Sequence, residues 1–321
     1  MSELKLSYMW LPYFEETVIF HLLKNLSKKK IKIVPPFESD ILFIGPSDAF
    51  SFKRRIYNKI KKKFLPNLEK SFENLDLYSF KRKYKPIRVS FASESVKNNF
   101  IKSDFSISSE FGVSNDKHLR FPYWKSHIDW SHEDIFRNNN SANVKRFGFY
   151  HKLDELIKPQ GNDFLKKKDM CIFSSHMEEP RLSIYESFLS EFKLDGYGPY
   201  FNKNLKNHNK SSFTKYEIMK KYSINLCPEN IIYPGCYSEK VTDSFIGKCL
   251  PVSCMDVSVG KDFNNKAFVN LVDYFSDNFL SIKNLLKDPI FLRKFTVEPL
   301  FITKPNLNNE KIFIEKLISH I

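Results

Sequence analysis

The sequence predicts an α/β protein built from two successive α/β halves. Apolar runs of strand length alternate with segments whose apolar residues recur at helical spacing, in the first third of the chain and again after residue 168. A polar stretch at residues 127–168 separates the two patterns. Strands that alternate with helices favour parallel sheets covered by helices on both faces.

The first half shows this alternation most clearly at residues 14–26. Its apolar side chains Val18, Ile19, Leu22 and Leu23 fall on one helical face. Short β-branched and aromatic runs on either side are typical of strands. We expect strands at residues 4–10, 31–34, 40–44, 87–92 and 104–107, and helices at residues 14–26 and 52–65.

The second half repeats the pattern. Pro180 suits the first position of a helix, and the apolar stripe that follows is Tyr185, Phe188, Leu189 and Phe192. We expect strands at residues 169–173, 194–198, 222–227, 250–254 and 266–271, and further helices at residues 239–246, 275–286 and 310–321.

These patterns predict an N-terminal domain at residues 1–155, a C-terminal domain at residues 156–302 and a C-terminal helix or tail at residues 303–321. Two α/β halves with a basic pocket between them favour a two-domain, nucleotide-dependent enzyme. The glycine-rich phosphate loops GxGxxG and GxxxxGK[S/T] are missing from the sequence. Phosphates would therefore be neutralised by Arg or Lys side chains and by amide groups at a helix start.

The 321 residues carry a net charge of +14, which attracts anions. The charge concentrates at residues 53–63 and 81–85, and we interpret these runs as solvated basic surface or as contacts to an anionic membrane face. No nucleic-acid-binding signature accompanies them, so nucleic acid is not an expected partner.

Five cysteines without a CxxC pair match neither a disulfide framework nor a zinc pattern. The N-terminus is charged too early for a signal peptide, and no run of about 20 apolar residues occurs. We therefore expect a cytoplasmic protein, peripheral to the membrane if it touches one.

Residues 221–251 hold the most site-like arrangement. An apolar strand ends in a polar loop with Glu229 and Asn230, and Ser238 is placed to cap a helix that begins with Glu239 and Lys240. A helix start and a lysine together suit a phosphate. The spacing alone favours an ordinary capped helix after a buried strand, with Lys240 at the surface.

Two acidic regions of the sequence allow more than one interpretation. Glu94 follows the strand at residues 87–92, the position where working groups collect in open α/β sheets, although most such acids are surface residues. His127 and His132, with Asp129, Glu133 and Asp134, match no metal spacing. We interpret that second segment as a solvated acidic loop, and no metal site is predicted.

With these residues in view, the chain resembles the α-1,3/4-fucosyltransferases of glycosyltransferase family ten, and bacterial members most closely. Residues 224–230 (INLCPEN) and 236–240 (CYSEK) are similar to the donor motif F-x-L-x-F-E-N-S…Y-V-T-E-K. Residues 259–270 are similar to the segment K-D-F-N-P-K-S-F-V-N-V. Further similarities are at residues 173–181, 94–95 and 119–122 (LRFP), so that the resemblance extends from about residue 13 to residue 301.

The resemblance implies a GT-B fold, with two Rossmann-like domains facing across a cleft. It implies an inverting transfer of L-fucose from GDP-fucose to a glycan hydroxyl, with no required metal. Glu94 would be the general base. The residues that would bind the donor are Arg181, Glu229, Asn230, Tyr237, Ser238, Glu239 and Lys240.

The expected acceptor is an oligosaccharide or lipid-linked glycan containing GlcNAc, in the synthesis of surface polysaccharide or lipopolysaccharide. The donor motif departs from the family at Cys236, where a tyrosine is usual, and at Pro228. Adjacent Tyr237 is a candidate replacement for that tyrosine. Two alternatives stay open: another GDP-deoxyhexose or nucleotide sugar as donor, and a non-catalytic glycan- or membrane-binding module.

Overall fold

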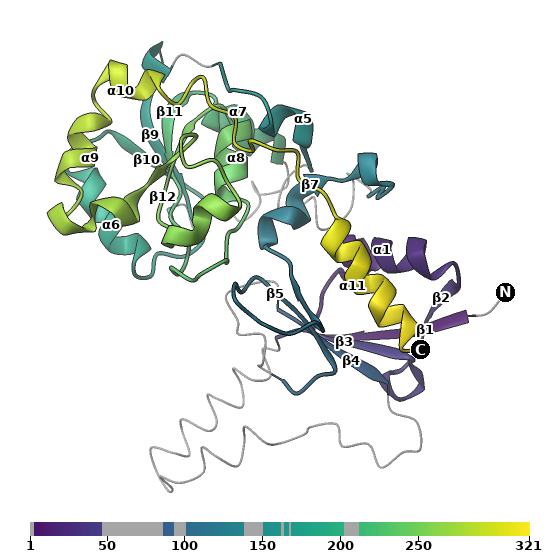
Figure 1. Ribbon diagram of the computed structural model, residues 1–321. Helices are drawn as coiled ribbons and strands as arrows, with labels where there is room; N and C mark the ends of the chain where they lie inside the picture. The colour runs from purple at the N-terminus through teal and green to yellow at the C-terminus, as the bar shows by residue number, and fades with distance from the viewer. Residues whose placement is uncertain are drawn as a thin grey trace, which may run out of the picture. The chain divides into compact units, whose positions relative to one another are not determined.

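The structure is a computed structural model, and it describes residues 3–46, 86–92, 101–137, 150–161, 164–166, 168–201 and 212–321. The described residues form two compact units (Figure 1). Unit 1 draws on Met1–Ser108, Gly112–Phe121 and Asn308–Ile321, and unit 2 on Ser109–Phe111 and Pro122–Leu307.

Unit 1 is built on a six-stranded sheet in the order β2-β1-β3-β4-β5-β6, with every pair parallel. Strand β3 is buried at all four positions, as expected for a strand covered on both faces. The strands are β1 (Glu3–Met9), β2 (Lys30–Ile33), β3 (Ile41–Ile44), β4 (Ile87–Phe91), β5 (Phe105–Ser108) and β6 (His118–Arg120).

Two helices contact each other in unit 1 although they come from opposite ends of the chain. Helix α1 (Val18–Ser27) begins after Thr17, whose hydroxyl accepts a hydrogen bond from the Phe20 amide at 3.2 Å. Helix α11 (Asn308–Ser319) lies beside α1 (Figure 1), and its Phe313 ring packs edge-on against Phe105 of β5. The C-terminal helix is therefore part of unit 1 and not a separate tail.

Unit 2 contains a five-stranded parallel sheet in the order β10-β9-β11-β12-β13. Alternate residues of β9 face opposite sides, so that Met170 and Ile172 pack with one hydrophobic cluster and Cys171 with another. The strands are β9 (Lys168–Phe173), β10 (Leu194–Tyr197), β11 (Tyr222–Leu226), β12 (Leu250–Ser253) and β13 (Val269–Asn270), and a separate pair is β7 (Ile128–Asp129) with β8 (His151–Lys152).

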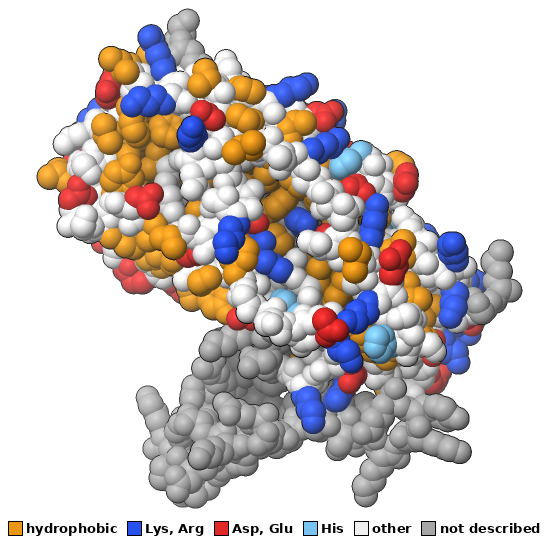
Figure 2. Space-filling model, in the orientation of Figure 1, with side chains coloured by type: hydrophobic (Ala, Val, Ile, Leu, Met, Phe, Trp, Pro, Cys, Tyr) orange, Lys and Arg blue, Asp and Glu red, His pale blue; other side chains and the backbone are white. Residues whose placement is uncertain are grey.

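Helices cover both faces of this sheet. Phe188 of α6 and Ile282 of α9 belong to the cluster of Ile172, whereas Tyr216 and Met219 of α7 belong to the cluster of Cys171. The helices of unit 2 are α5 (Leu153–Leu156), α6 (Arg181–Leu189), α7 (Ser212–Met219), α8 (Lys240–Ile246), α9 (Leu280–Leu285) and α10 (Pro289–Arg293). Exposed hydrophobic side chains, among them Leu280 and Ile290, gather over α9 and α10 on the face drawn in Figure 2.

Several predicted boundaries differ from the structure. The chain passes between the units near residues 108, 111, 121 and 307 rather than near residue 155, and residues 127–137 and 150–161 belong to unit 2. The expected strand at residues 266–271 is limited to β13. The expected helix at residues 275–286 is divided between a 3₁₀ segment (Leu271–Asp277) and α9, because Asn278 and Phe279 adopt positive φ. The predicted helix at residues 52–65 lies outside the described residues.

None of the helices in the described segments is both long enough and apolar enough to cross a membrane.

Gly235 occupies a position in unit 2 that no other residue fits without strain. Its φ is +86°, and a Cβ atom there would lie 2.2 Å from the carbonyl oxygen of Ser109. We predict that Gly235→Ala lowers the free energy of unfolding by more than about 2 kcal/mol, measured by urea denaturation.

Gly161 is the matched control for this prediction. Its φ is +58°, but nothing lies within 4 Å of a Cβ at that position. Gly161→Ala should therefore cost only roughly 1 kcal/mol of backbone strain. Equal losses in the two variants would contradict the close approach at Ser109.

Candidate functional site

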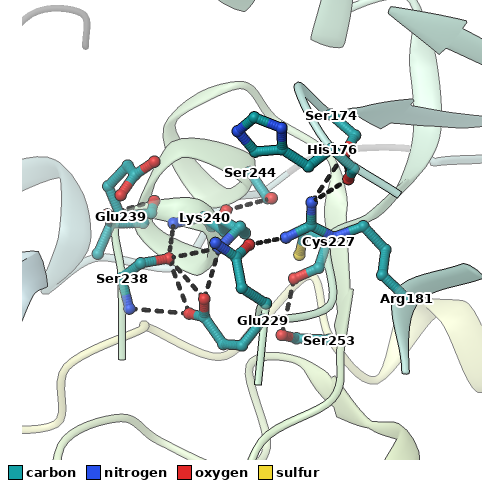
Figure 3. A network of polar contacts seen from close by, with 12 residues as sticks. Ser174, His176, Arg181, Cys227, Glu229, Ser238, Glu239, Lys240, Ser244 and Ser253 are labelled. Atoms are coloured by element: carbon teal, nitrogen blue, oxygen red, sulfur yellow. Dashed lines mark hydrogen bonds and ion pairs between the residues drawn. The ribbon is translucent and has the colours of Figure 1, made fainter. Parts of the chain in front are cut away.

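A cluster of polar side chains lies where parallel strands of unit 2 end (Figure 3). Ser174 directly follows β9, Glu229 and Asn230 lie in the loop after β11, and Arg181 and Lys240 begin helices α6 and α8. Parallel strands bring their carboxyl ends to one edge of the sheet, which explains how residues up to 66 positions apart in the chain meet there.

Three hydrogen bonds hold the guanidinium group of Arg181 in a fixed orientation. Its Nη1 atom donates to Ser174 Oγ at 2.7 Å and to the His176 carbonyl oxygen at 2.6 Å, and its Nη2 atom donates to Asn230 Oδ1. Burial lowers the pKa of Arg181, and the nearby carboxylates of Glu229, Glu178 and Glu239 oppose that shift. The result is a buried cation whose direction is set before any ligand arrives.

Glu229 is the acidic centre of the cluster. Its side chain is buried, and its carboxylate accepts hydrogen bonds from the Ser238 amide and the Ser238 hydroxyl, each at 2.8 Å. Lys240 Nζ lies 2.5 Å from Glu229 Oε2 and 3.1 Å from Ser238 Oγ. A buried carboxylate is tolerated when it is paired and hydrogen-bonded in this way. Glu229 thereby fixes the position of the lysine ammonium group.

Glu239 lies beside a buried histidine that the sequence analysis placed in a solvated loop. His127 is only 5% exposed, and its Nε2 atom lies 3.9 Å from Glu239 Oε2. Burial lowers the pKa of His127 to about 4, so its ring is neutral at pH 7. The prediction that His127 lies in a solvated loop is therefore wrong.

Asp243, one turn along α8 from Glu239, was not singled out from the sequence. It is completely buried, and its carboxylate meets Lys215 Nζ, Tyr216 Oη at 3.0 Å and His151 Nε2 at 2.9 Å. Burial opposes ionisation of this acid, but the charge of Lys215 and the contact with His151 outweigh it and hold the pKa of Asp243 well below its ordinary range.

The seven predicted donor-binding residues fall into two groups. Arg181 contacts Asn230, and Glu229, Ser238 and Lys240 contact one another, with Glu229 and Asn230 adjacent in the chain. Glu239 lies between Ser238 and Lys240 in the chain. Tyr237 does not join them, because its side chain is only 1% exposed and its hydroxyl donates to Asp256 at 2.6 Å. Glu94 lies outside the described residues.

The start of α8 differs from the prediction. Glu239 is the N-cap residue and no side chain caps the helix, although the Ser238 hydroxyl accepts a long bond from the Lys240 amide at 3.4 Å. The helix has seven residues. Any anion held here would therefore depend mainly on the Arg181 and Lys240 side chains, and little on the helix dipole.

Among the described residues, no group of three or more His, Cys, Asp or Glu side chains is arranged to hold a metal ion. A cavity of about 390 Å³ opens beside β13 and α10, and its lining includes Lys266, Asn270 and Lys294 but none of the predicted donor-binding residues.

Comparison with solved structures identifies the fold. Unit 1 and unit 2 have the parallel α/β architecture of the GT-B glycosyltransferases, and the chain shares this fold with solved α1,3-fucosyltransferases. One crystal structure of an α1,3-fucosyltransferase has a TM-score of 0.66 at 22% identity, covering 99% of this chain and 90% of the other. A second, solved with GDP-fucose, has a TM-score of 0.65 at 21% identity with the same coverage.

Sequence comparison leads to the same class of protein. The chain is 28% identical to the α-(1,3)-fucosyltransferase of Helicobacter pylori over 203 residues, which are 58% of this chain and 41% of that relative. The matched region thus spans less than half of the curated relative. No family model matches the chain. The resemblance to fucosyltransferases that the sequence motifs indicate is confirmed.

We predict that His127 makes stability depend on pH. The unfolded chain binds a proton on this histidine below about pH 6.5, while the folded protein resists it down to about pH 4. The free energy of unfolding should therefore fall as the pH drops from 6.5 to 4.5, by about 2 to 3 kcal/mol from this residue. Urea denaturation at the two pH values measures the change.

His127→Gln should remove most of this loss, because the replacement does not titrate. His132 provides the control, since it is exposed and lies five residues away. His132→Gln should keep the wild-type pH dependence. An unchanged slope in His127→Gln would show that the buried histidine is not its source.

Proposed function

We propose that this protein is an inverting glycosyltransferase that moves L-fucose from GDP-fucose to a hydroxyl group of a glycan. The observation that carries the proposal is the convergence of Arg181 and Lys240, two cations held in place by Asn230 and Glu229, at the carboxyl edge of the sheet. Two fixed cations suit a diphosphate, whose leaving requires neutralisation of negative charge. The similarity in sequence and fold to α1,3-fucosyltransferases supports the choice of donor.

In the proposed reaction the acceptor hydroxyl oxygen attacks C1 of the fucose ring from the face opposite to GDP. The bond between C1 and the β-phosphate oxygen breaks as the new glycosidic bond forms, so the anomeric configuration inverts. Glu94 takes the proton of the acceptor hydroxyl. Arg181 and Lys240 neutralise the departing GDP, and Glu239 and Asn230 contact the donor.

The proposal also names the acceptor, the linkage, the metal requirement and the location of the enzyme. The acceptor is a GlcNAc-containing oligosaccharide or lipid-linked glycan, the product belongs to a surface polysaccharide or lipopolysaccharide, and the linkage is of the α-1,3 type. The enzyme requires no metal and works in the cytoplasm, at the inner face of the membrane. The basic runs at residues 53–63 and 81–85 support the membrane contact by their charge.

A transfer assay tests the proposal directly. The protein is incubated with GDP-fucose and N-acetyllactosamine or a lipid-linked glycan, with and without EDTA, and the product is analysed by mass spectrometry and by NMR of the anomeric proton. We expect an α-fucoside at the same rate in both conditions. A parallel panel of other nucleotide sugars tests the donor, since Cys236 departs from the family motif.

The proposal is overturned if three results occur together: no transfer of fucose, no slow hydrolysis of GDP-fucose and no GDP binding by calorimetry. Transfer from a different GDP-deoxyhexose would keep the reaction and change the donor.

Substitutions separate donor binding from chemistry. Lys240→Ala should weaken GDP binding by about 10-fold to 100-fold, because a charge-assisted contact to phosphate is lost. Glu94→Gln should leave GDP binding unchanged and lower the rate of transfer by roughly 10²-fold to 10⁴-fold, because the proton acceptor is lost. Calorimetry and initial rates give the two quantities.

Lys287→Ala is the control for the loss of one positive charge. Lys287 pairs with Glu191 on the surface of unit 2 at 2.8 Å and takes no part in the cluster. Its replacement should change neither quantity. A GDP affinity in Lys240→Ala equal to that of Lys287→Ala would remove Lys240 from the donor site.

A further inference from the structure

Helix α8 carries two proposed donor contacts at its start and a buried acid one turn later. Glu239 is the N-cap residue and Lys240 the first residue of the helix, and Asp243 follows four positions after Glu239. Residues four apart lie on the same side of a helix, and here the Asp243 amide donates to the Glu239 carbonyl at 2.7 Å. A displacement of Asp243 therefore moves Glu239 and Lys240 with it.

The partners of Asp243 come from two elements outside α8. Lys215 and Tyr216 lie on α7, and His151 lies on β8, 92 positions earlier in the chain. All three converge on one carboxylate that has no exposed surface. An apolar side chain would fill the same space without the cost of burying charge, so a buried ion pair is weak support for stability alone. Directional contacts from two elements instead restrict both rotation and sliding of the helix.

Two other contacts hold the same turn of α8. Ser244 Oγ donates to the Lys240 carbonyl oxygen at 2.5 Å and accepts a hydrogen bond from Asn225 of β11 at 2.7 Å. Ser244 thus links α8 to the sheet, while Asp243 links it to α7 and β8. The start of α8 is in this way held by separate contacts to three elements.

We propose that Asp243, through its ion pair with Lys215, is a positioning residue that holds the start of α8 so that Glu239 and Lys240 are directed at the donor. The identity of the ligand rests on the proposed function, whereas the claim about α8 does not. Neither Asp243 nor Lys215 touches the donor in this account. Their effect on the donor passes through the backbone of the helix.

The test uses four variants of the full chain. Lys215→Met removes the cation, Lys215→Arg keeps it, Asp243→Asn removes the anion, and the double variant Asp243→Asn/Lys215→Met removes both charges. Lys220→Met is the matched control, because Lys220 directly follows α7 and pairs only with Glu217 at the exposed surface, at 2.6 Å. Each protein is measured for its urea unfolding midpoint, for GDP affinity by calorimetry and for amide hydrogen exchange at residues 239–244.

The proposal makes different demands on these three measurements. Lys215→Met and Asp243→Asn should weaken GDP binding at least 10-fold and speed exchange at residues 239–244 at least 10-fold more than elsewhere in unit 2. Lys215→Arg should retain most of the wild-type affinity, and Lys220→Met all of it. The double variant should regain its unfolding midpoint, because no buried charge is left unpaired, but should not regain GDP affinity.

A merely structural role predicts another result. If GDP affinity follows the unfolding midpoint across all variants, or if Lys215→Met binds GDP as the wild type does with unchanged exchange at residues 239–244, the proposal is overturned. Hydrogen exchange needs no ligand, so it decides the claim about α8 even when the wild type binds no GDP. A wild-type protein that binds no GDP would contradict the proposed function, not the claim about α8.

Discussion

The carboxylate of Glu229 is the interaction on which the candidate site depends. It accepts hydrogen bonds from the backbone and side chain of Ser238 and pairs with Lys240, so a single buried acid closes the loop between β11 and α8. Without that acid, the half-buried ammonium group of Lys240 would lose its counter-charge, and Ser238 would lose the carboxylate that ties it to the loop after β11. A diphosphate that binds to Lys240 must share this lysine with Glu229 or displace the Glu229 carboxylate.

Charges of opposite sign alternate around the start of α8. Arg181 contacts Asn230, the chain neighbour of Glu229, while Glu229 contacts Ser238 and Lys240. Asp243 and Lys215 form another ion pair on the next turn. Glu229 pairs with Lys240 and Asp243 pairs with Lys215, whereas the hydrogen-bond partners of Arg181 are neutral groups and nearby carboxylates act on its charge at longer range. The protein can therefore keep cations fixed in direction without leaving them uncompensated, which is the electrostatic preorganisation expected of a site for a charged leaving group.

Most strands could be predicted from the sequence because their apolar runs are local signals. The family resemblance predicted that Glu229, Asn230 and Lys240 belong to one site. His127 and Asp243 could not be found in this way. His127 lies 112 positions from Glu239, and the partners of Asp243 lie 27, 28 and 92 positions away, so no local spacing encodes these contacts. Tyr237 shows a second limit. Tyr237 is adjacent in sequence to Cys236, where the family motif has a tyrosine, but its side chain points to Asp256 in the interior. The place of the C-terminal helix could not be predicted for a third reason, because α11 packs against α1 rather than against its neighbours in the chain.

The membership of α11 in unit 1 also sets the order in which the parts of unit 1 are synthesised. The strands of unit 1 and α1 precede most of unit 2 in the chain, whereas α11 follows unit 2. Until α11 is synthesised, the side of Phe105 that Phe313 covers stays exposed in the nascent chain. Exposed apolar surface of this kind promotes aggregation during synthesis. Residues 308–321 therefore complete the cover over strands that are synthesised long before them.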